Sequence, residues 1–259
     1  MKLKITIVIL SVICFTNCKN KEEKVVESEK PFAQNTKEPL LKIHPIEHAS
    51  TVVEYGNTTI YIDPTLGAEA YKTYGTPNFV VITDVHFDHL ALETLKALDL
   101  NNSKIIAPKA VIDKLPDALV SKSILMNNGD LKTFDTFKIE ALPMYNLREE
   151  ALKFHEKGRG NGYVFTFGIE RVYFSGDTED IAEMRALKAI DKAFICMNSP
   201  YTMTVESAAS AVLEFNPKEV YPYHYRGTDG FSDVKKFKRI VNTANPDIEV
   251  VLLDWYPQH

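Results

Sequence analysis

A six-residue run with four metal-ligand side chains constrains this chain more than any other feature. Residues 84–89 read Asp-Val-His-Phe-Asp-His. The apolar run 79–82 before it is typical of a buried strand, and residues 90–98 after it carry apolar side chains at helical spacing. The run therefore occupies a strand-to-helix loop, where successive side chains can turn inward onto one or two cations. Acids and histidines also solvate surface loops, but this density of ligand types favours a metal site.

Two further ligand candidates follow short apolar and aromatic runs later in the chain. Asp177 stands in Phe-Ser-Gly-Asp-Thr, and His224 stands in Tyr-Pro-Tyr-His-Tyr. Strand ends that each deliver one ligand to the same edge of a sheet can assemble a metal site from distant parts of a sequence. We therefore expect both residues to join the 84–89 run.

The order of predicted elements indicates an α+β fold with two packed sheets covered outside by helices. Hairpin strands dominate the first half of the chain, and helices alternate with strands in the second. The predicted strands are 41–43, 52–63 with a turn at 55–57, 79–83, 104–107, 121–126, 137–142, 162–168, 171–175, 192–197, 219–222 and 248–253. The predicted helices are 90–98, 178–187, 204–215 and 232–241.

These motifs resemble those of the metallo-β-lactamase superfamily. Residues 84–89 are similar to its His-x-His-x-Asp-His signature, with Asp84 in place of the first histidine, and residues 175–178 and 222–224 are similar to its bridging-aspartate and last-histidine segments. Other segments resemble the branch that includes the ascorbate-phosphate lactonases and the N-acyl phosphatidylethanolamine phospholipase D enzymes: Glu47–Ser50, Ile62–Pro64, Gly158–Tyr163 and Tyr201–Thr204. The resemblance covers about residue 40 to the C-terminus and implies a four-layer αββα sandwich.

The resemblance also implies two metal-ligand groups joined by a bridging carboxylate. These are Asp84 and His86 for a first cation, Asp88, His89 and His224 for a second, and Asp177 as the bridge. For the third ligand of the first cation we favour His155, with a solvent-facing loop histidine as the alternative. An aspartate in place of a histidine adds a hard oxygen donor, which favours manganese or iron over zinc or weakens the first site. We expect one or two divalent ions.

The expected chemistry is hydrolysis. A metal lowers the pKa of a bound water toward neutrality, and the resulting hydroxide attacks an ester, lactone or phosphodiester, with Asp88 holding and orienting it. The resemblance places His48 at the mouth of the active site, the alternative being a half-buried structural histidine. Tyr201 and Arg226 are candidates to stabilise an oxyanion or to hold a substrate phosphate or carboxylate. Asp63 either orients a ligand histidine or forms an Asp-Pro turn.

The N-terminal residues indicate export and a lipid anchor. Lys2 and Lys4 precede the apolar stretch 5–15, which is too short for the roughly 20 residues that span a bilayer. Cys18 follows this stretch where a bacterial lipoprotein signal ends, so we predict residues 1–18 as that signal, with a plain signal peptide or a retained short anchor as alternatives. Residues 19–39 have the polar composition of a flexible tether, and residues 40–259 form the hydrolase domain. This places the domain at the bacterial cell envelope, lipid-anchored to a membrane outside the cytoplasm.

Charge and cysteine content limit the partners. The net charge of −5 repels nucleic acid, so we expect a small-molecule or lipid substrate. Cys196, in an apolar run, is expected to be a buried core thiol rather than a nucleophile. The sequence lacks the Gly-x-Ser-x-Gly elbow of a serine hydrolase. The competing hypothesis is a non-catalytic, lipid-anchored metal-binding or scaffold protein with a degenerate metal site.

Overall fold

The structure is a computed structural model that describes residues 39–257. The predicted signal peptide, the predicted lipidation site Cys18 and the predicted tether up to residue 38 lie outside the described residues. Within residues 39–257, no helix is both long enough and apolar enough to cross a membrane.

The first half of the described chain forms a six-stranded sheet in sequential order. Its first three strands pair antiparallel, and the later strands add in parallel. The strands are β1 Leu41–Glu47, β2 Ser50–Tyr55, β3 Thr58–Ile62, β4 Phe79–Val81, β5 Lys104–Ala107 and β6 Ser123–Leu125. The helical segments between them are η1 Ala68–Tyr71, α1 Leu92–Ala97, α2 Lys109–Ile112 and α3 Asp117–Val120.

The second half forms a seven-stranded mixed sheet in the order β15-β12-β11-β10-β9-β8-β7. Its strands are β7 Leu131–Thr133, β8 Lys138–Met144, β9 Gly160–Phe167, β10 Glu170–Phe174, β11 Lys192–Cys196, β12 Glu219–Tyr223 and β15 Glu249–Val250. The helical segments are η2 Glu149–Ala151, α4 Ala182–Arg185, α5 Val205–Phe215 and α6 Val234–Ala244, and a small hairpin pairs β13 Arg226–Gly227 with β14 Gly230–Phe231.

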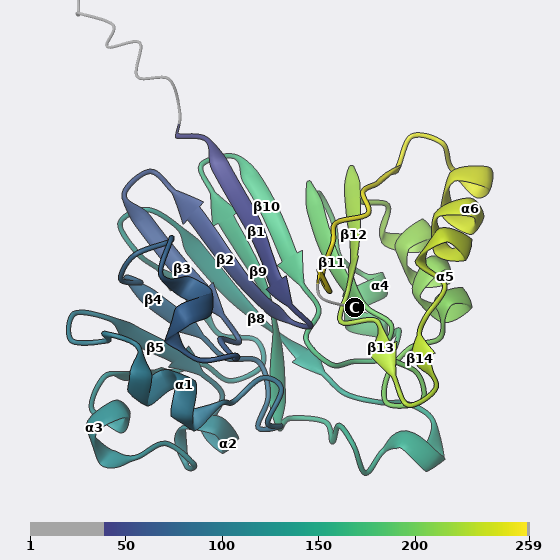
Figure 1. The fold of residues 1–259 in the computed structure, drawn as a ribbon. Coiled ribbons are helices and arrows are strands. Elements are labelled where there is room, and N and C mark those ends of the chain that lie inside the picture. Colours follow the sequence, from purple (N-terminus) through teal and green to yellow (C-terminus); the bar gives the residue numbers. More distant parts are fainter. Residues whose placement is uncertain (1–38, 258–259) are drawn as a thin grey trace, which may run out of the picture. The chain divides into compact units, whose positions relative to one another are not determined.

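The core consists of layers that follow from strand alternation. Val53 on β2 packs in the cluster shared by both sheets, whereas its neighbour Val52 packs in the cluster between the first sheet and its helices. On the second sheet, Phe174 and Phe194 stack with their ring centroids 4.4 Å apart. Figure 1 shows α1–α3 on one outer side and α5 and α6 on the other, with the sheets between them. The predicted four-layer αββα sandwich is confirmed.

Several predicted elements are shorter in the structure. The helix predicted at 178–187 is reduced to α4, because its expected start is bound to a neighbouring loop: the Tyr145 N–H donates to Thr178 Oγ1 (3.1 Å) and Thr178 Oγ1 donates to the Tyr145 carbonyl (2.9 Å). The strand predicted at 248–253 is limited to β15. The short elements β7, α2, α3, β13 and β14 are missing from the prediction, since two to four residues do not establish a periodicity.

Candidate metal centre

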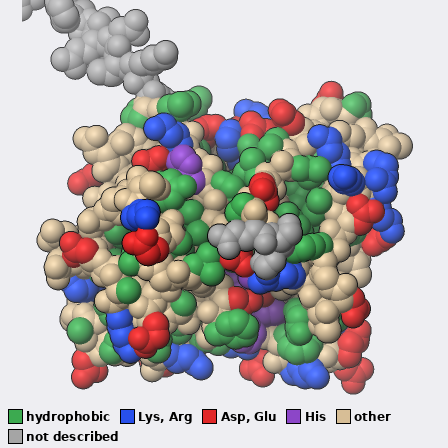
Figure 2. All heavy atoms as spheres, in the orientation of Figure 1, with side chains coloured by type: hydrophobic (Ala, Val, Ile, Leu, Met, Phe, Trp, Pro, Cys, Tyr) green, Lys and Arg blue, Asp and Glu red, His purple; other side chains and the backbone are tan. Residues whose placement is uncertain are grey.

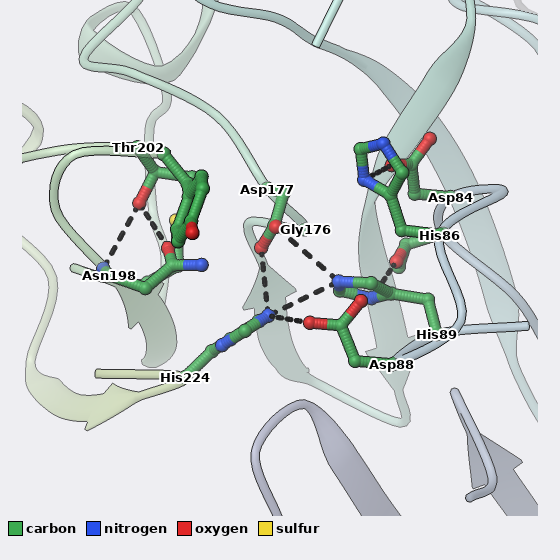
Figure 3. Close-up of polar contacts among 12 residues, drawn as sticks. Asp84, His86, Asp88, His89, Gly176, Asp177, Asn198, Thr202 and His224 are labelled. Carbon is green, nitrogen blue, oxygen red and sulfur yellow. Dashed lines mark hydrogen bonds and ion pairs between the residues drawn. The ribbon is translucent and has the colours of Figure 1, made fainter. Parts of the chain in front are cut away.

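Strands of both sheets deliver the candidate ligands to one edge of the sandwich. The loop 84–89 follows β4, Asp177 follows β10 and His224 follows β12, while His155 lies in the connection between β8 and β9. Figure 3 shows Asp88, His89, Asp177 and His224 pointing toward one another, with Asp84 and His86 to one side. His224 has a positive φ of 45°, a sparsely populated conformation for a residue other than glycine. Such a backbone is typical of functional sites, where the surrounding structure holds it in place.

Four residues bring donor atoms close together. His224 Nε2 lies 3.2 Å from His89 Nε2, 3.3 Å from Asp177 Oδ1 and 3.5 Å from Asp88 Oδ2, and His89 Nε2 lies 3.4 Å from Asp177 Oδ2. Ligands about 2.0–2.1 Å from a tetrahedral zinc ion are separated from each other by about 3.4 Å. The distances therefore fit a divalent cation bound between these side chains.

Asp63 fixes the orientation of His89. Its Oδ2 lies 2.8 Å from His89 Nδ1, and it also accepts hydrogen bonds from the Thr83 N–H (2.7 Å) and the Thr83 hydroxyl (2.6 Å). A carboxylate at this place keeps the proton of His89 on Nδ1 and leaves the Nε2 lone pair for a metal. Asp63 also has a positive φ of 44° at the end of β3, so it both turns the chain and orients a histidine of the centre.

The other predicted ligands, Asp84, His86 and His155, lie beside these four residues. Asp84 Oδ2 lies 2.8 Å from His86 Nδ1, and His155 Nε2 lies 3.9 Å from Asp84 Oδ2 and 3.2 Å from Asp177 Oδ2. His155 is only 1% exposed, so the alternative of a solvent-facing loop histidine is wrong. Within the described residues, His155 Nε2 and Asp177 Oδ1 are buried atoms without a hydrogen-bond partner, as expected for atoms whose partner is a ligand.

Arg159 is the residue of the centre whose role the sequence does not reveal. Its Nε donates to Asp84 Oδ1 (3.0 Å) and its Nη2 to Asp84 Oδ2 (2.8 Å), while Nη2 also donates to the Phe154 carbonyl. The same Nη2 lies 3.5 Å from His86 Nε2. The family resemblance of the Gly158–Tyr163 segment assigns this arginine no role. A buried carboxylate at Asp84 needs a partner, and that need is the signal that points to a nearby cation.

The carboxylates of the centre are held ionised. Burial alone would raise the pKa of Asp84, but the hydrogen bond from His86 and the positive charges of His89 and Arg159 lower it to about 2. Burial likewise opposes ionisation of Asp177, and the charges of His224 and His89 outweigh it and hold the Asp177 pKa well below its usual range. Metal ligands must be deprotonated, so these shifts suit a cation site at neutral pH.

A cavity of about 360 Å³ opens above the centre. In Figure 2, acidic and histidine side chains come to the surface together below the middle of the face, between hydrophobic groups. The predicted substrate-side residues Tyr201 and Arg226 line the cavity. The other lining residues are His86, Phe87, Asp88, Phe154, His155, Asp177, Asn198, His224, Gly227 and Thr228.

His48 lies behind the centre and is not among the residues that line the cavity. Its Nδ1 is 3.2 Å from His224 Nδ1 and 3.0 Å from the Tyr256 hydroxyl, and its Nε2 is 2.6 Å from Arg226 Nη2. Burial, followed by the charges of His224 and Arg226, lowers the pKa of His48 to about 3, so it is neutral at physiological pH. His48 is half-buried and contacts His224, and its place at the mouth of the active site stays a prediction.

The family model of the beta-lactamase superfamily domain matches residues 42–224. The chain belongs to the metallo-β-lactamase superfamily. Since the match contains the 84–89 run, Asp177 and His224, it covers the ligand groups described above.

Several relatives of this superfamily member are metal-dependent or metallo hydrolases by name. The chain is 38% identical to a proposed metal-dependent hydrolase of Parabacteroides distasonis, with a TM-score of 0.75 over 83% of this chain and 94% of the other. It is 26% identical to the metallo hydrolase Igni18 of Ignicoccus hospitalis, with a TM-score of 0.68 over 82% and 94% of the two chains. A UPF0173 metal-dependent hydrolase of Natranaerobius thermophilus is 28% identical over 71% of this chain and 83% of its own. Together with the ligand groups, these similarities identify a metal-dependent hydrolase.

Proposed function

We propose that this hydrolase cleaves an ester, lactone or phosphodiester bond of a small molecule or lipid. The observation that supports the proposal is the group of donor atoms from Asp88, His89, Asp177 and His224, with contacts of 3.2–3.5 Å, beside a cavity. The donors are two imidazoles and two carboxylates, a set that suits zinc, manganese or iron.

A divalent cation held by these side chains supplies Lewis acidity and lowers the pKa of a coordinated water toward neutrality. Asp88 is the ligand carboxylate that also borders the cavity, with its side chain 24% exposed. The hydrogen bond with His224 and the charge of His89 outweigh burial and hold the pKa of Asp88 below its usual value. Asp88 is therefore ionised and can accept a hydrogen bond from the attacking water. This hydrogen bond fixes the direction of the lone pair on the water oxygen.

Tyr201 and Arg226 supply donors on the substrate side. Thr228 Oγ1 donates to the Tyr201 hydroxyl (3.0 Å), so the proton of that hydroxyl remains able to be donated to a substrate oxygen. The guanidinium of Arg226 pairs with Glu47 (3.3 Å) and borders the same cavity. These groups suit the negative charge that develops on a carbonyl or phosphoryl oxygen during hydrolysis. The exposed ring of Phe87 at the rim offers contact to an apolar part of a substrate.

The non-catalytic scaffold hypothesis is weakened by the position of His155. The scaffold hypothesis depended on Asp84 and on the lack of a third histidine for the first cation. His155 removes the second of these grounds, because its Nε2 lies within the centre.

The decisive experiment compares His224→Ala with His44→Ala. Purified protein is loaded with zinc or manganese and assayed on p-nitrophenyl esters, lactones and bis-p-nitrophenyl phosphate. His224→Ala removes a donor atom and should reduce turnover by more than about 100-fold. His44 lies on β1, outside the centre, and serves as the matched control. Its Nε2 pairs with Glu54 on β2 (2.8 Å). Unchanged turnover in His224→Ala would contradict the assignment.

We also propose that the domain acts at a bacterial cell envelope, anchored through an acylated Cys18. The support is the sequence pattern of residues 1–18, a lysine-flanked apolar stretch that ends at a cysteine. Such an anchor would hold the cavity near lipid substrates without a spanning helix.

A further inference from the structure

The ligand group of Asp84, His86 and His155 contains a cation of the protein's own. The guanidinium of Arg159 forms two parallel hydrogen bonds with Asp84, at 3.0 Å and 2.8 Å. This bidentate arrangement is the strongest form of an arginine–carboxylate pair. The Asp84 side chain is fully buried and that of Arg159 is 19% exposed, so water screens the pair only weakly.

Within this group, Asp84 and His86 have the spacing of a hydrogen bond. Asp84 Oδ2 accepts from Arg159 and lies 2.8 Å from His86 Nδ1, which is shorter than the separation of about 3.4 Å between ligands of a tetrahedral cation. In the group around His224, by contrast, the four donor–donor distances are 3.2–3.5 Å. Each oxygen of Asp84 accepts a hydrogen bond from Arg159, and a second cation would lie against this fixed positive charge.

The backbone next to Arg159 fixes its position. The Asn161 N–H donates to the Thr83 carbonyl (3.0 Å), so the start of β9 is joined to the residue before Asp84. A Cβ on Gly160 would come within 2.8 Å of the same carbonyl oxygen, so only glycine permits this close approach. The guanidinium is therefore placed at Asp84 by the sheet itself and not by a mobile surface loop.

We infer that Arg159 takes the place of the first cation, and that the protein binds a single divalent ion at Asp88, His89, Asp177 and His224. The inference rests on the proposed function for the second ligand group. Asp84 then serves as the partner of Arg159 and does not set the metal preference. His86 and His155 border the cavity as imidazoles without a metal, and they can hydrogen-bond a substrate.

The test is the metal content of the full chain after loading with excess zinc or manganese and desalting, measured by inductively coupled plasma mass spectrometry. The wild type should retain one equivalent, and Arg159→Ala should retain two, because Asp84 can then act as a ligand. Arg171→Ala is the matched control. Arg171 pairs with Glu140 (3.1 Å) on the second sheet, outside the centre, so this variant should retain one equivalent.

A double variant keeps the test independent of stability. Because Arg159→Ala leaves a buried carboxylate unpaired, Asp84→His/Arg159→Ala is measured beside it, with folding checked by circular dichroism. It removes both charges and restores the histidine of the family signature, and two equivalents are expected. Two equivalents of metal in the wild type, or one equivalent in both folded variants, would overturn the single-ion inference and leave the proposed function intact. No metal in the wild type, or one equivalent that His224→Ala does not remove, would instead overturn the proposed function.

Discussion

Replacement of Asp63 by Asn should weaken metal binding although Asp63 is not itself a ligand. The Asp63 carboxylate accepts from the Thr83 N–H, the Thr83 hydroxyl and His89 Nδ1. In Asp63→Asn the amide oxygen can keep the Thr83 N–H, which places the NH₂ group against His89 Nδ1. An NH₂ group only donates, so His89 satisfies it only with an unprotonated Nδ1. The His89 proton then moves to Nε2, where it blocks the lone pair that a metal needs.

The size of the effect follows from the bond that must be given up. To bind metal, the variant must return the proton to Nδ1 and lose the hydrogen bond from the introduced amide, leaving two donors in contact inside a fully buried cluster. A buried donor left without an acceptor costs about 1–3 kcal/mol. At about 1.4 kcal/mol for each factor of ten, metal affinity should fall by about 10- to 100-fold.

The assay is competition for zinc with a chromophoric chelator, and Thr83→Val is the matched control. Thr83→Val removes a hydroxyl from the same buried cluster but leaves Asp63 as the acceptor for His89. It should therefore lower the free energy of unfolding by about 1–3 kcal/mol while metal affinity changes little. If Asp63→Asn binds zinc as tightly as the wild type, or if both variants lose affinity equally, the position of the His89 proton does not control metal binding.

Three further predictions concern residues with other roles. Burial raises the pKa of the Cys196 thiol to about 11. Iodoacetamide at about pH 8 should therefore modify this thiol only after the protein is unfolded in urea, as measured by peptide mass spectrometry. Modification of the folded protein would contradict this prediction. The pKa of Asp84 is lowered from 3.8 to about 2. Above about pH 4 its ionised form therefore adds about 2 kcal/mol to the free energy of unfolding, and this contribution is lost as the pH falls through about 2. The free energy of unfolding of metal-free Asp84→Asn, measured in urea, should accordingly depend less on pH in this range than that of the wild type. Equal dependence on pH in the two proteins would contradict this contribution of Asp84. Cys18→Ala should leave the membrane fraction on cell fractionation, whereas full retention would mean a different anchor.

The positions of most candidate ligands could be predicted from the sequence because these residues follow short apolar strands. Asp177 and His224 come directly after β10 and β12, and neighbouring parallel strands end at the same edge of a sheet. The four-layer fold was accessible for the same reason, since the strand alternation and the family resemblance agree.

Contacts between distant side chains could not be predicted in this way. His48 is separated from His224 by 176 positions and meets it through ring nitrogens. No periodicity reports such a contact, because it depends on the positive φ angles of both residues, 53° and 45°. The exposure of His155 was undecidable for a similar reason, because the connection between β8 and β9 is long and only its folding over the centre buries this ring.

Arg159 changes the meaning of the aspartate in the family signature. Alone, Asp84 indicates a weakened metal site, because a carboxylate replaces an imidazole. Paired with Arg159, it forms a neutral unit that satisfies both oxygens inside the protein. One divalent cation and Arg159 together match the charge of the three carboxylates that meet at the centre, Asp84, Asp88 and Asp177, whereas two cations and Arg159 would exceed it. Asp84 and Arg159 are therefore expected to act together, and removing Arg159 should raise the number of metal ions that the centre holds.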